Sequence, residues 1–137
     1  TGSDLAVAVG LTHDVSRDVD AFVRRQLPAV GSILVAQPSN GPGARSVACG
    51  RHAFELAETL TSTLRSALPK PSSTLHLFIA APNAFTFFLG QRQSALGSVH
   101  LYEFDFDGQR DRSYRRSIIL PFGKPPNNTE PLADKAQ

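Results

Sequence analysis

Apolar and polar positions along the chain fall into blocks that have the lengths of strands and helices. Residues 5–11 are an apolar run of strand length, and residues 15–27 repeat apolar side chains at helical spacing, with Asp and Arg between them. Residues 32–37 have the composition of a second strand, and the turn-forming residues 38–43 follow it. The next helix is expected to present one apolar face, formed by Ala53, Ala57, Leu60, Leu64 and Leu68.

The stretch around which the rest of the chain is organised has a strand pattern that is followed within three residues by a helix pattern. Residues 74–80 predict a buried strand, and Ala81 and Pro82 stop it. Asn83 can cap a helix there, because its side-chain oxygen can accept hydrogen bonds from the first amides. The helix that follows is apolar on almost every side, so we expect it to be buried and to end at Gly97.

Two further strands complete the pattern. Residues 99–106 alternate apolar and polar side chains, and residues 117–120 form a short apolar run. The connection between them is short and begins with Asp107 and Gly108, so the pair must be antiparallel. The order β-α-β-α-β-α-β-β predicts an α/β, Rossmann-like fold, with a mostly parallel sheet, helices on both faces and a final antiparallel hairpin strand. With strand order 2-1-3-4-5, the ligand crevice is expected between the carboxyl ends of the first and third strands.

Length and composition limit the domain count and the class of partner. A chain of 137 residues makes one domain, which we assign to residues 1–121, and the Pro-, Asn- and charge-rich residues 122–137 predict a flexible tail. The absence of Met suggests a piece of a longer protein. The net charge of +2 suits an anionic ligand but is too small for a protein that coats long nucleic acid. A single Cys, and the lack of an apolar run of membrane-spanning length, favour a cytoplasmic protein that does not enter a membrane.

Enzyme motifs are weak in this sequence. It has no G-x-S-x-G elbow, Walker sequence or zinc-ligand spacing, and residues 41–46 match the dinucleotide pattern G-x-G-x-x-G only in part. Cys49 and His52 stand three positions apart near a helix start, as a nucleophile and its base would. The favoured alternative is a buried Cys and a surface His, because free Cys is among the most buried residue types. We therefore expect no catalytic residue, metal or cofactor.

Histidine and aromatic positions offer other candidates. His13 follows the first strand, at the edge where this architecture binds ligands, although an exposed residue in a helix-capping turn is the alternative. His76 lies within a strand pattern and is interpreted as a core histidine with satisfied hydrogen bonds. An aromatic triplet could stack on a nucleobase, but core packing is its commoner role. This triplet consists of Phe85, Phe87 and Phe88.

A cluster of four arginines surrounds the last hairpin. It is formed by Arg110, Arg112, Arg115 and Arg116. Such a cluster could bind phosphate groups. Three aspartates are interleaved with it, so a solvated turn of mixed charge is the favoured interpretation.

Three segments in this order resemble a known family. They are LAVAVGLTHDV at residues 5–15, LHLFIAAPNAFTFFLGQRQSALG at residues 75–97 and VHLYEFD at residues 99–105. Together they resemble the SAVED domain, the sensor module of bacterial anti-phage systems (CBASS and some type III CRISPR systems). The match runs over most of residues 4–121 and resembles only the carboxyl-terminal one of the family's two Rossmann-like halves.

The resemblance implies a function in sensing. It implies a domain that binds a cyclic oligonucleotide, often a cyclic oligoadenylate, and that switches on a fused or associated effector domain or subunit. In the family the pocket is shared with a sister half or a neighbouring protomer. Carried over to this chain, the ligand site comprises Thr12, His13, Pro38, Ser39, Asn40, Gly41, Ala81, Pro82, Asn83, Phe85, Tyr102 and Glu103.

The physical chemistry of this edge agrees with such a ligand. Helix amino termini and loops of small residues can supply amide donors to phosphate groups without a full positive charge.

Two alternatives from other classes stay open. One is a structural or oligomerisation module without a ligand, and the other is a small hydrolase that uses Cys49 and His52.

Overall fold

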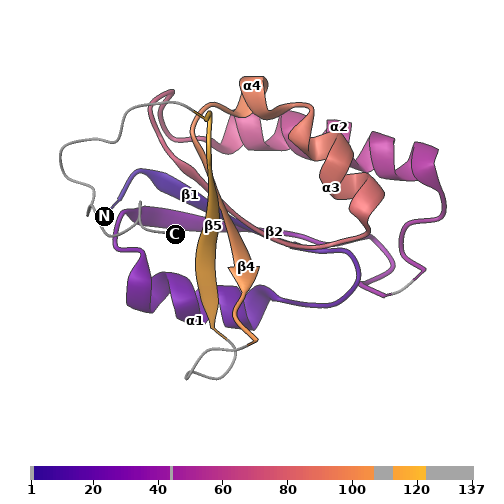
Figure 1. The fold of residues 1–137 in the computed structure, drawn as a ribbon, viewed down its shortest axis with the longest axis horizontal. Helices are drawn as coiled ribbons and strands as arrows, with labels where there is room; N and C mark the ends of the chain where they lie inside the picture. Colours follow the sequence, from indigo (N-terminus) through magenta and orange to yellow (C-terminus); the bar gives the residue numbers. More distant parts are fainter. Residues whose placement is uncertain (1, 44, 107–112, 123–137) are drawn as a thin grey trace.

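The computed structural model describes residues 2–43, 45–106 and 113–122, which contain five strands and four helices (Figure 1). In chain order the elements are β1 (Asp4–Gly10), α1 (Ser16–Gln26), β2 (Val30–Ala36), α2 (Gly50–Ala67), β3 (Leu75–Ala80), α3 (Asn83–Gly90), α4 (Gln93–Leu96), β4 (Val99–Phe104) and β5 (Tyr114–Leu120). This order matches the predicted one, except that the third helix is divided into α3 and α4.

The strands form one sheet in the order β2-β1-β3-β4-β5. The first four run parallel, and β5 pairs with β4 in the antiparallel direction. The predicted Rossmann-like α/β class and its strand order 2-1-3-4-5 are therefore confirmed. Parallel neighbours need crossover connections, and in this chain helices α1 to α4 supply them.

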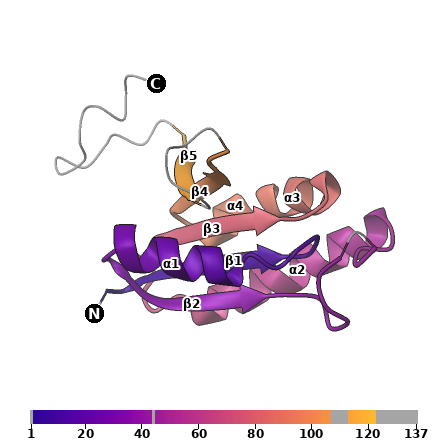
Figure 2. The same cartoon turned by 90° about the horizontal axis from the view of Figure 1, so that it is seen from below.

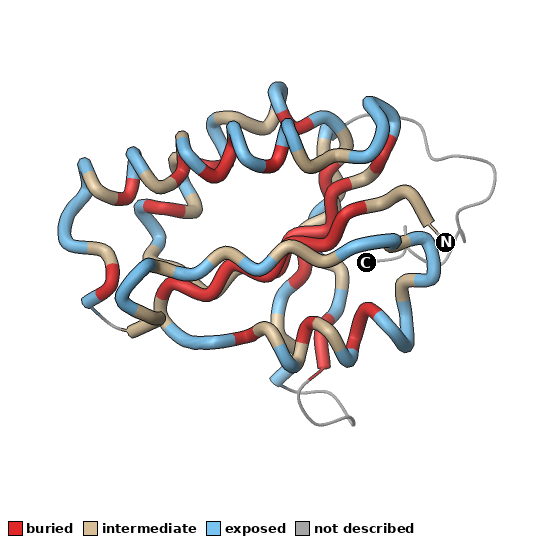
Figure 3. Tube along the Cα trace, turned by 180° about the vertical axis from the view of Figure 1, so that it is seen from behind, coloured by how far each residue is buried: buried red, intermediate tan, exposed pale blue. Residues whose placement is uncertain are grey.

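Helices cover both faces of the sheet. Figure 1 shows α1 below the sheet and α2, α3 and α4 above it, and Figure 2 shows α1 in front of the strands when the molecule is seen from below. Successive side chains of β1 enter two different cores, because residues of a strand point alternately to its two faces. Val7 packs in the cluster with Leu64 of α2, whereas Ala8 packs in the cluster with Phe22 of α1 and Phe78 of β3. Figure 3 shows the resulting line of buried residues through the middle of the sheet.

Strand β4 separates from β3 before β3 ends. β1 and β3 are paired as far as Gly10 and Ala80, but the pairing of β3 with β4 stops at Phe78 and Tyr102. Beyond that point β4 pairs with β5 alone, and the two strands run steeply across the direction of β1 and β2 in Figure 1. The carboxyl ends of β3 and β4 are therefore separated by a wedge-shaped gap in the hydrogen-bonding ladder.

The prediction that the helix after β3 is buried on almost every side is wrong. Phe85 and Leu89 of α3 are buried in the core, but Phe87 is 62% exposed. Phe88 is partly buried against the core and contacts Phe54 of α2 edge to face, with ring centroids 5.4 Å apart. A helix of eight residues that lies on another helix buries the side chains of only one of its faces. The sequence does not show which face this is, because apolar residues also occupy positions on the exposed faces.

The remaining boundaries differ by a few residues. β4 ends at Phe104 rather than residue 106, and β5 begins at Tyr114 rather than residue 117. Gly97 follows α4 with φ of 75°, a conformation that favours glycine and that ends the helical segment as expected. The predicted flexible tail at residues 122–137 lies, apart from Phe122, outside the described residues.

Candidate functional site

The loop after β1 is fastened to the end of β3. The carbonyl oxygen of Ala80 accepts hydrogen bonds from the amides of Leu11 at 2.8 Å and Thr12 at 3.0 Å. These bonds hold Thr12 and His13 beside Ala81. They also leave no gap between the ends of β1 and β3, where the crevice was expected.

The cavity lies one strand further on, in the wedge between β3 and β4. Its volume is about 760 Å³, within the range of small-molecule sites. The loop after β1, the end of β3, the start of α3, strands β4 and β5 and the first turn of α1 all contribute to its wall. The lining residues are His13, Val15, Asp18, Ile79, Ala80, Ala81, Asn83, Thr86, Leu101, Tyr102, Glu103, Phe104, Phe106, Tyr114, Ser117 and Ile118.

The cavity brings together five of the residues assigned to the ligand site from the sequence. These are His13, Ala81, Asn83, Tyr102 and Glu103. Thr12 and Pro82 are each adjacent in sequence to one of them but do not line this cavity. Phe85 is buried in the core beneath α3 and lines a separate apolar cavity next to α2.

His13 is exposed on a short turn. Its Nδ1 lies 3.2 Å from the hydroxyl oxygen of Thr12. Asp14 stabilises the turn, because its Oδ1 accepts hydrogen bonds from the amide of Ser16 at 2.9 Å and from its hydroxyl at 2.7 Å. The same two bonds lower the pKa of Asp14, so this carboxylate in the turn before α1 is ionised.

Asn83 does not cap α3, so that prediction is wrong. Asn83 is the first residue of the helix, Pro82 occupies the N-cap position, and no side chain caps this start. Backbone bonds from Phe85 and Thr86 to the carbonyl of Pro82 close the first turn. The side chain of Asn83 is exposed, and helix N-termini offer amide donors to whatever occupies the cavity.

The loop between β2 and α2 lies against the loop after β1. Gly43 donates a 3.0 Å backbone hydrogen bond to the carbonyl of Leu11, which also accepts one from the hydroxyl of Ser46. Pro38 and Gly41 close a turn through a 3.0 Å bond, and Gly41 has φ of 86°. The assigned residues Pro38, Ser39, Asn40 and Gly41 thus form a turn after β2 and do not line the cavity.

Tyr102 connects the cavity with a buried polar cluster. Its hydroxyl oxygen lies 2.9 Å from Nδ1 of His76, and Nε2 of His76 lies 2.9 Å from Oδ2 of Asp4. The Tyr102 ring stacks on Phe78 at 4.5 Å with an interplanar angle of 12°. Burial raises the pKa of Tyr102 to about 12, so the hydroxyl keeps its proton. The prediction that His76 is a core histidine with satisfied hydrogen bonds is confirmed.

Three aromatic residues of the cavity wall were not identified from the sequence as site residues. Phe104 contacts Phe106 with ring centroids 4.8 Å apart and Tyr114 with centroids 5.4 Å apart. The alternating pattern of residues 99–106 indicated a strand, and it contained no sign that the strand would diverge from β3 and expose this aromatic group.

The sequence of the chain matches a family of sensor domains. Residues 1–120 match the family SAVED, described as the SMODS-associated and fused to various effectors sensor domain. The chain belongs to the SAVED family. It is also 42% identical over 118 residues to CD-NTase-associated protein 4 of Enterobacter hormaechei subsp. hoffmannii (strain UCI 50), an alignment that covers 86% of this chain and 24% of that relative. The SAVED domain described here therefore spans about a quarter of the relative's length.

Among the described contacts of this SAVED domain, no hydrogen bond joins Cys49 to His52. Cys49 is exposed, so the prediction of a buried Cys is wrong. Nδ1 of His52 accepts a 3.0 Å hydrogen bond from the amide of Ala48, a bond that fastens the chain at the start of α2. His52 thus has a structural role at a helix start.

An ion pair crosses the last two strands of the sheet. Nε of Arg115 donates to Oε1 of Glu103 at 2.9 Å, across the β4–β5 pair. Arg110 and Arg112 lie outside the described residues.

Over the part of the chain that the structure describes, no cluster of His, Cys, Asp and Glu could hold a metal ion, and no helix has the length and hydropathy to span a membrane.

Proposed function

We propose that this SAVED domain binds a cyclic oligonucleotide second messenger, a cyclic oligoadenylate in particular, in the cavity between β3 and β4. The domain would act as a sensor without catalysis of its own and would activate a fused or associated effector in anti-phage defence. Membership of a family of effector-fused sensors supports this role, as does the 42% identity to a CD-NTase-associated protein.

The observation that carries the proposal is the divergence of β4 from β3. It opens a cavity of about 760 Å³ at the edge where open α/β sheets bind ligands. The start of α3 borders this cavity with Asn83, and the loop after β1 borders it with His13. Both groups can form hydrogen bonds with phosphate or ribose oxygens.

The cavity is open to solvent, and its volume of about 760 Å³ accommodates part of a cyclic oligonucleotide. We therefore propose that the remainder of the ligand contacts a sister SAVED half or a neighbouring protomer. The alignment with about a quarter of CD-NTase-associated protein 4 agrees with a domain that works beside further parts.

Calorimetric titration with cyclic tri- and tetra-adenylate tests the function. The proposal predicts saturable binding, with linear oligoadenylates of the same length as the control. A flat titration with every cyclic oligonucleotide, in a protein that contains this domain and its sister half, would contradict it.

A structural or oligomerisation module is the second candidate. The observation in its favour is the aromatic surface of α2 and α3, where Phe87 is 62% exposed beside the Phe54 and Phe88 pair. Surfaces of this kind mark interaction sites. Light scattering separates the two candidates, because a pure assembly module would associate with no dependence on added cyclic oligonucleotide.

A further inference from the structure

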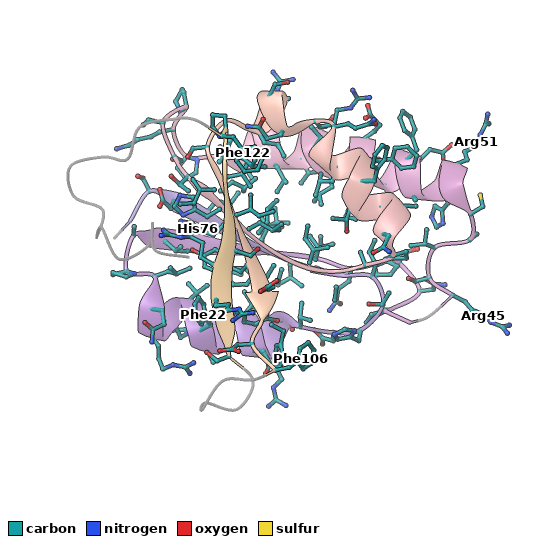
Figure 4. All side chains as sticks on the ribbon, viewed as in Figure 1. Phe22, Arg45, Arg51, His76, Phe106 and Phe122 are labelled. Atoms are coloured by element: carbon teal, nitrogen blue, oxygen red, sulfur yellow. The ribbon has the colours of Figure 1, made fainter. Side chains whose placement is uncertain are left out.

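Phe106 is the most exposed of the aromatic side chains that line the cavity. It lies just beyond Asp105, the residue that follows β4, and it lines the cavity and is 87% exposed. Figure 4 shows it at the carboxyl end of β4, close to α1. Burial of a phenyl ring is favourable, so an exposed ring beside a cavity offers a ligand an apolar surface on which it can stack.

The ring of Phe106 is supported from behind. Its centroid lies 4.8 Å from that of Phe104, with an angle of 54° between the rings. Phe104 in turn packs edge to face on Tyr114 at 5.4 Å and 84°. The three residues form a continuous aromatic wall that ends in one ring open to the cavity.

The charges beside this wall favour a base over a phosphate. The charged or titratable side chains among the described lining residues are His13, Asp18, Tyr102, Glu103 and Tyr114, and none of the described lining residues is Lys or Arg. Carboxylates accept hydrogen bonds from exocyclic amino groups and ribose hydroxyls. Glu103 is paired with Arg115 at 2.9 Å, so the charge of this wall is partly compensated and the wall attracts phosphate only weakly. The start of α3, across the cavity, is the position better suited to phosphate.

We propose that Phe106, backed by Phe104, is the platform on which one nucleobase of the ligand stacks. The inference rests on the proposed function and assigns the orientation of the ligand within the same cavity. The base meets the wall formed by β4 and β5, and the phosphate faces the start of α3. Stacking on an aromatic side chain tolerates any base, so Phe106 contributes affinity more than selectivity among bases.

A tryptophan at this position makes stacking visible. The chain contains no Trp, so Phe106→Trp introduces a single tryptophan whose fluorescence reports on its own surroundings. Cyclic triadenylate and free adenosine are both expected to quench it, whereas inorganic phosphate is not. Phe87→Trp, at an exposed position of α3 that does not line the cavity, is the matched control and should show no quenching.

Affinity measurements complete the test. Phe106→Leu should weaken the binding of cyclic triadenylate about tenfold or more, and Phe87→Leu should leave it unchanged. The measurement uses a protein that contains this domain and its proposed sister half. If the parent binds and Phe106→Leu binds equally well, the stacking platform is wrong and the proposed function stands. If the parent does not bind any cyclic oligonucleotide, both are wrong.

Discussion

The hydroxyl oxygen of Tyr102 lies 2.9 Å from Nδ1 of His76, and this contact joins the wall of the cavity to the interior of the sheet. On its other side His76 meets the carboxylate of Asp4 at 2.9 Å. A carboxylate oxygen accepts hydrogen bonds, so the tautomer of His76 with its proton on Nε2 donates to Asp4 and leaves Nδ1 to accept from Tyr102. The three side chains thus satisfy one another, with Tyr102 and His76 buried and Asp4 at the partly exposed end of the cluster.

Tyr102→Phe tests the strength of this arrangement. The variant keeps the ring that stacks on Phe78 but leaves Nδ1 of His76 without its donor. We expect the free energy of unfolding to fall by about 1 to 3 kcal/mol, the usual cost of an unsatisfied buried group. Urea denaturation measures this loss. Phe87→Leu, on the exposed side of α3, is the control and should change stability by less than about 0.5 kcal/mol. Equal stability of Tyr102→Phe and the parent would show that the hydroxyl contact contributes nothing.

His100 gives the stability a pH dependence. Burial, together with the neighbouring His76 and Arg116, lowers the pKa of His100 from 6.5 to about 4. The unfolded chain therefore binds this proton more readily than the folded protein, and folding is favoured by the neutral imidazole. The contribution is fully present above about pH 6.5 and is lost as the pH falls toward about 4.

His100→Gln isolates this contribution. Glutamine does not titrate, so the variant should lose less stability than the parent between pH 6.5 and pH 4. Denaturant curves recorded at several pH values give the slope of the free energy of unfolding against pH for the variant and for the parent. Phe87→Leu serves as the control, because it removes no titratable group and should leave the slope of the parent unchanged. Parallel curves for His100→Gln and the parent would contradict the lowered pKa.

Gly10 is required by the turn that presents His13. A Cβ atom at this position would lie 2.7 Å from the carbonyl oxygen of His13, and a backbone atom cannot move aside cheaply. Gly10→Ala should therefore lower the free energy of unfolding by about 1 to 3 kcal/mol. At Gly50, the first residue of α2, a Cβ would meet no atom within 4 Å, so Gly50→Ala should be neutral or stabilising. Thermal unfolding of the two variants compares them, and equal melting temperatures would contradict the close contact.

The sheet could be predicted from the sequence because the local strand and helix patterns agree with the overall topology. The apolar runs that become β1 and β3 are each followed by a helix, and right-handed crossovers leave few ways to order such strands. His76 was recognisable for the same reason, since a polar residue inside a buried strand must find partners.

The shape of the site depends on features that no local pattern encodes. The divergence of β4 from β3 after Tyr102 moves the cavity one strand away from the position expected from the strand order. The same divergence brings Phe106 to the rim of the cavity, although its alternating pattern suggested an ordinary strand residue. Cys49 was expected to be buried from its residue type, but its position just before α2 leaves it exposed.

The exposed thiol of Cys49 gives a test of whether the ligand site lies away from the Cys49 and His52 pair. In the folded protein we expect iodoacetamide to label Cys49, because the side chain is accessible. The labelled protein and Cys49→Ser should bind cyclic oligonucleotide as the parent does, since Cys49 does not line the cavity. Loss of binding on labelling would place Cys49 in the site and contradict the present assignment.

The most direct test of the ligand site compares His13→Ala with the parent protein by calorimetric titration with cyclic oligoadenylate. His13 borders the cavity, is exposed and makes its described side-chain contact with Thr12, so its loss should hardly change the melting temperature. One hydrogen bond to a charged partner is worth about 1 to 3 kcal/mol, and the affinity should therefore fall at least several-fold. Asn83→Ala, at the other side of the cavity, should behave in the same way because Asn83 does not cap α3. Equal affinity of both variants and the parent, in a protein that contains both halves, would contradict the assignment of this cavity as the ligand site.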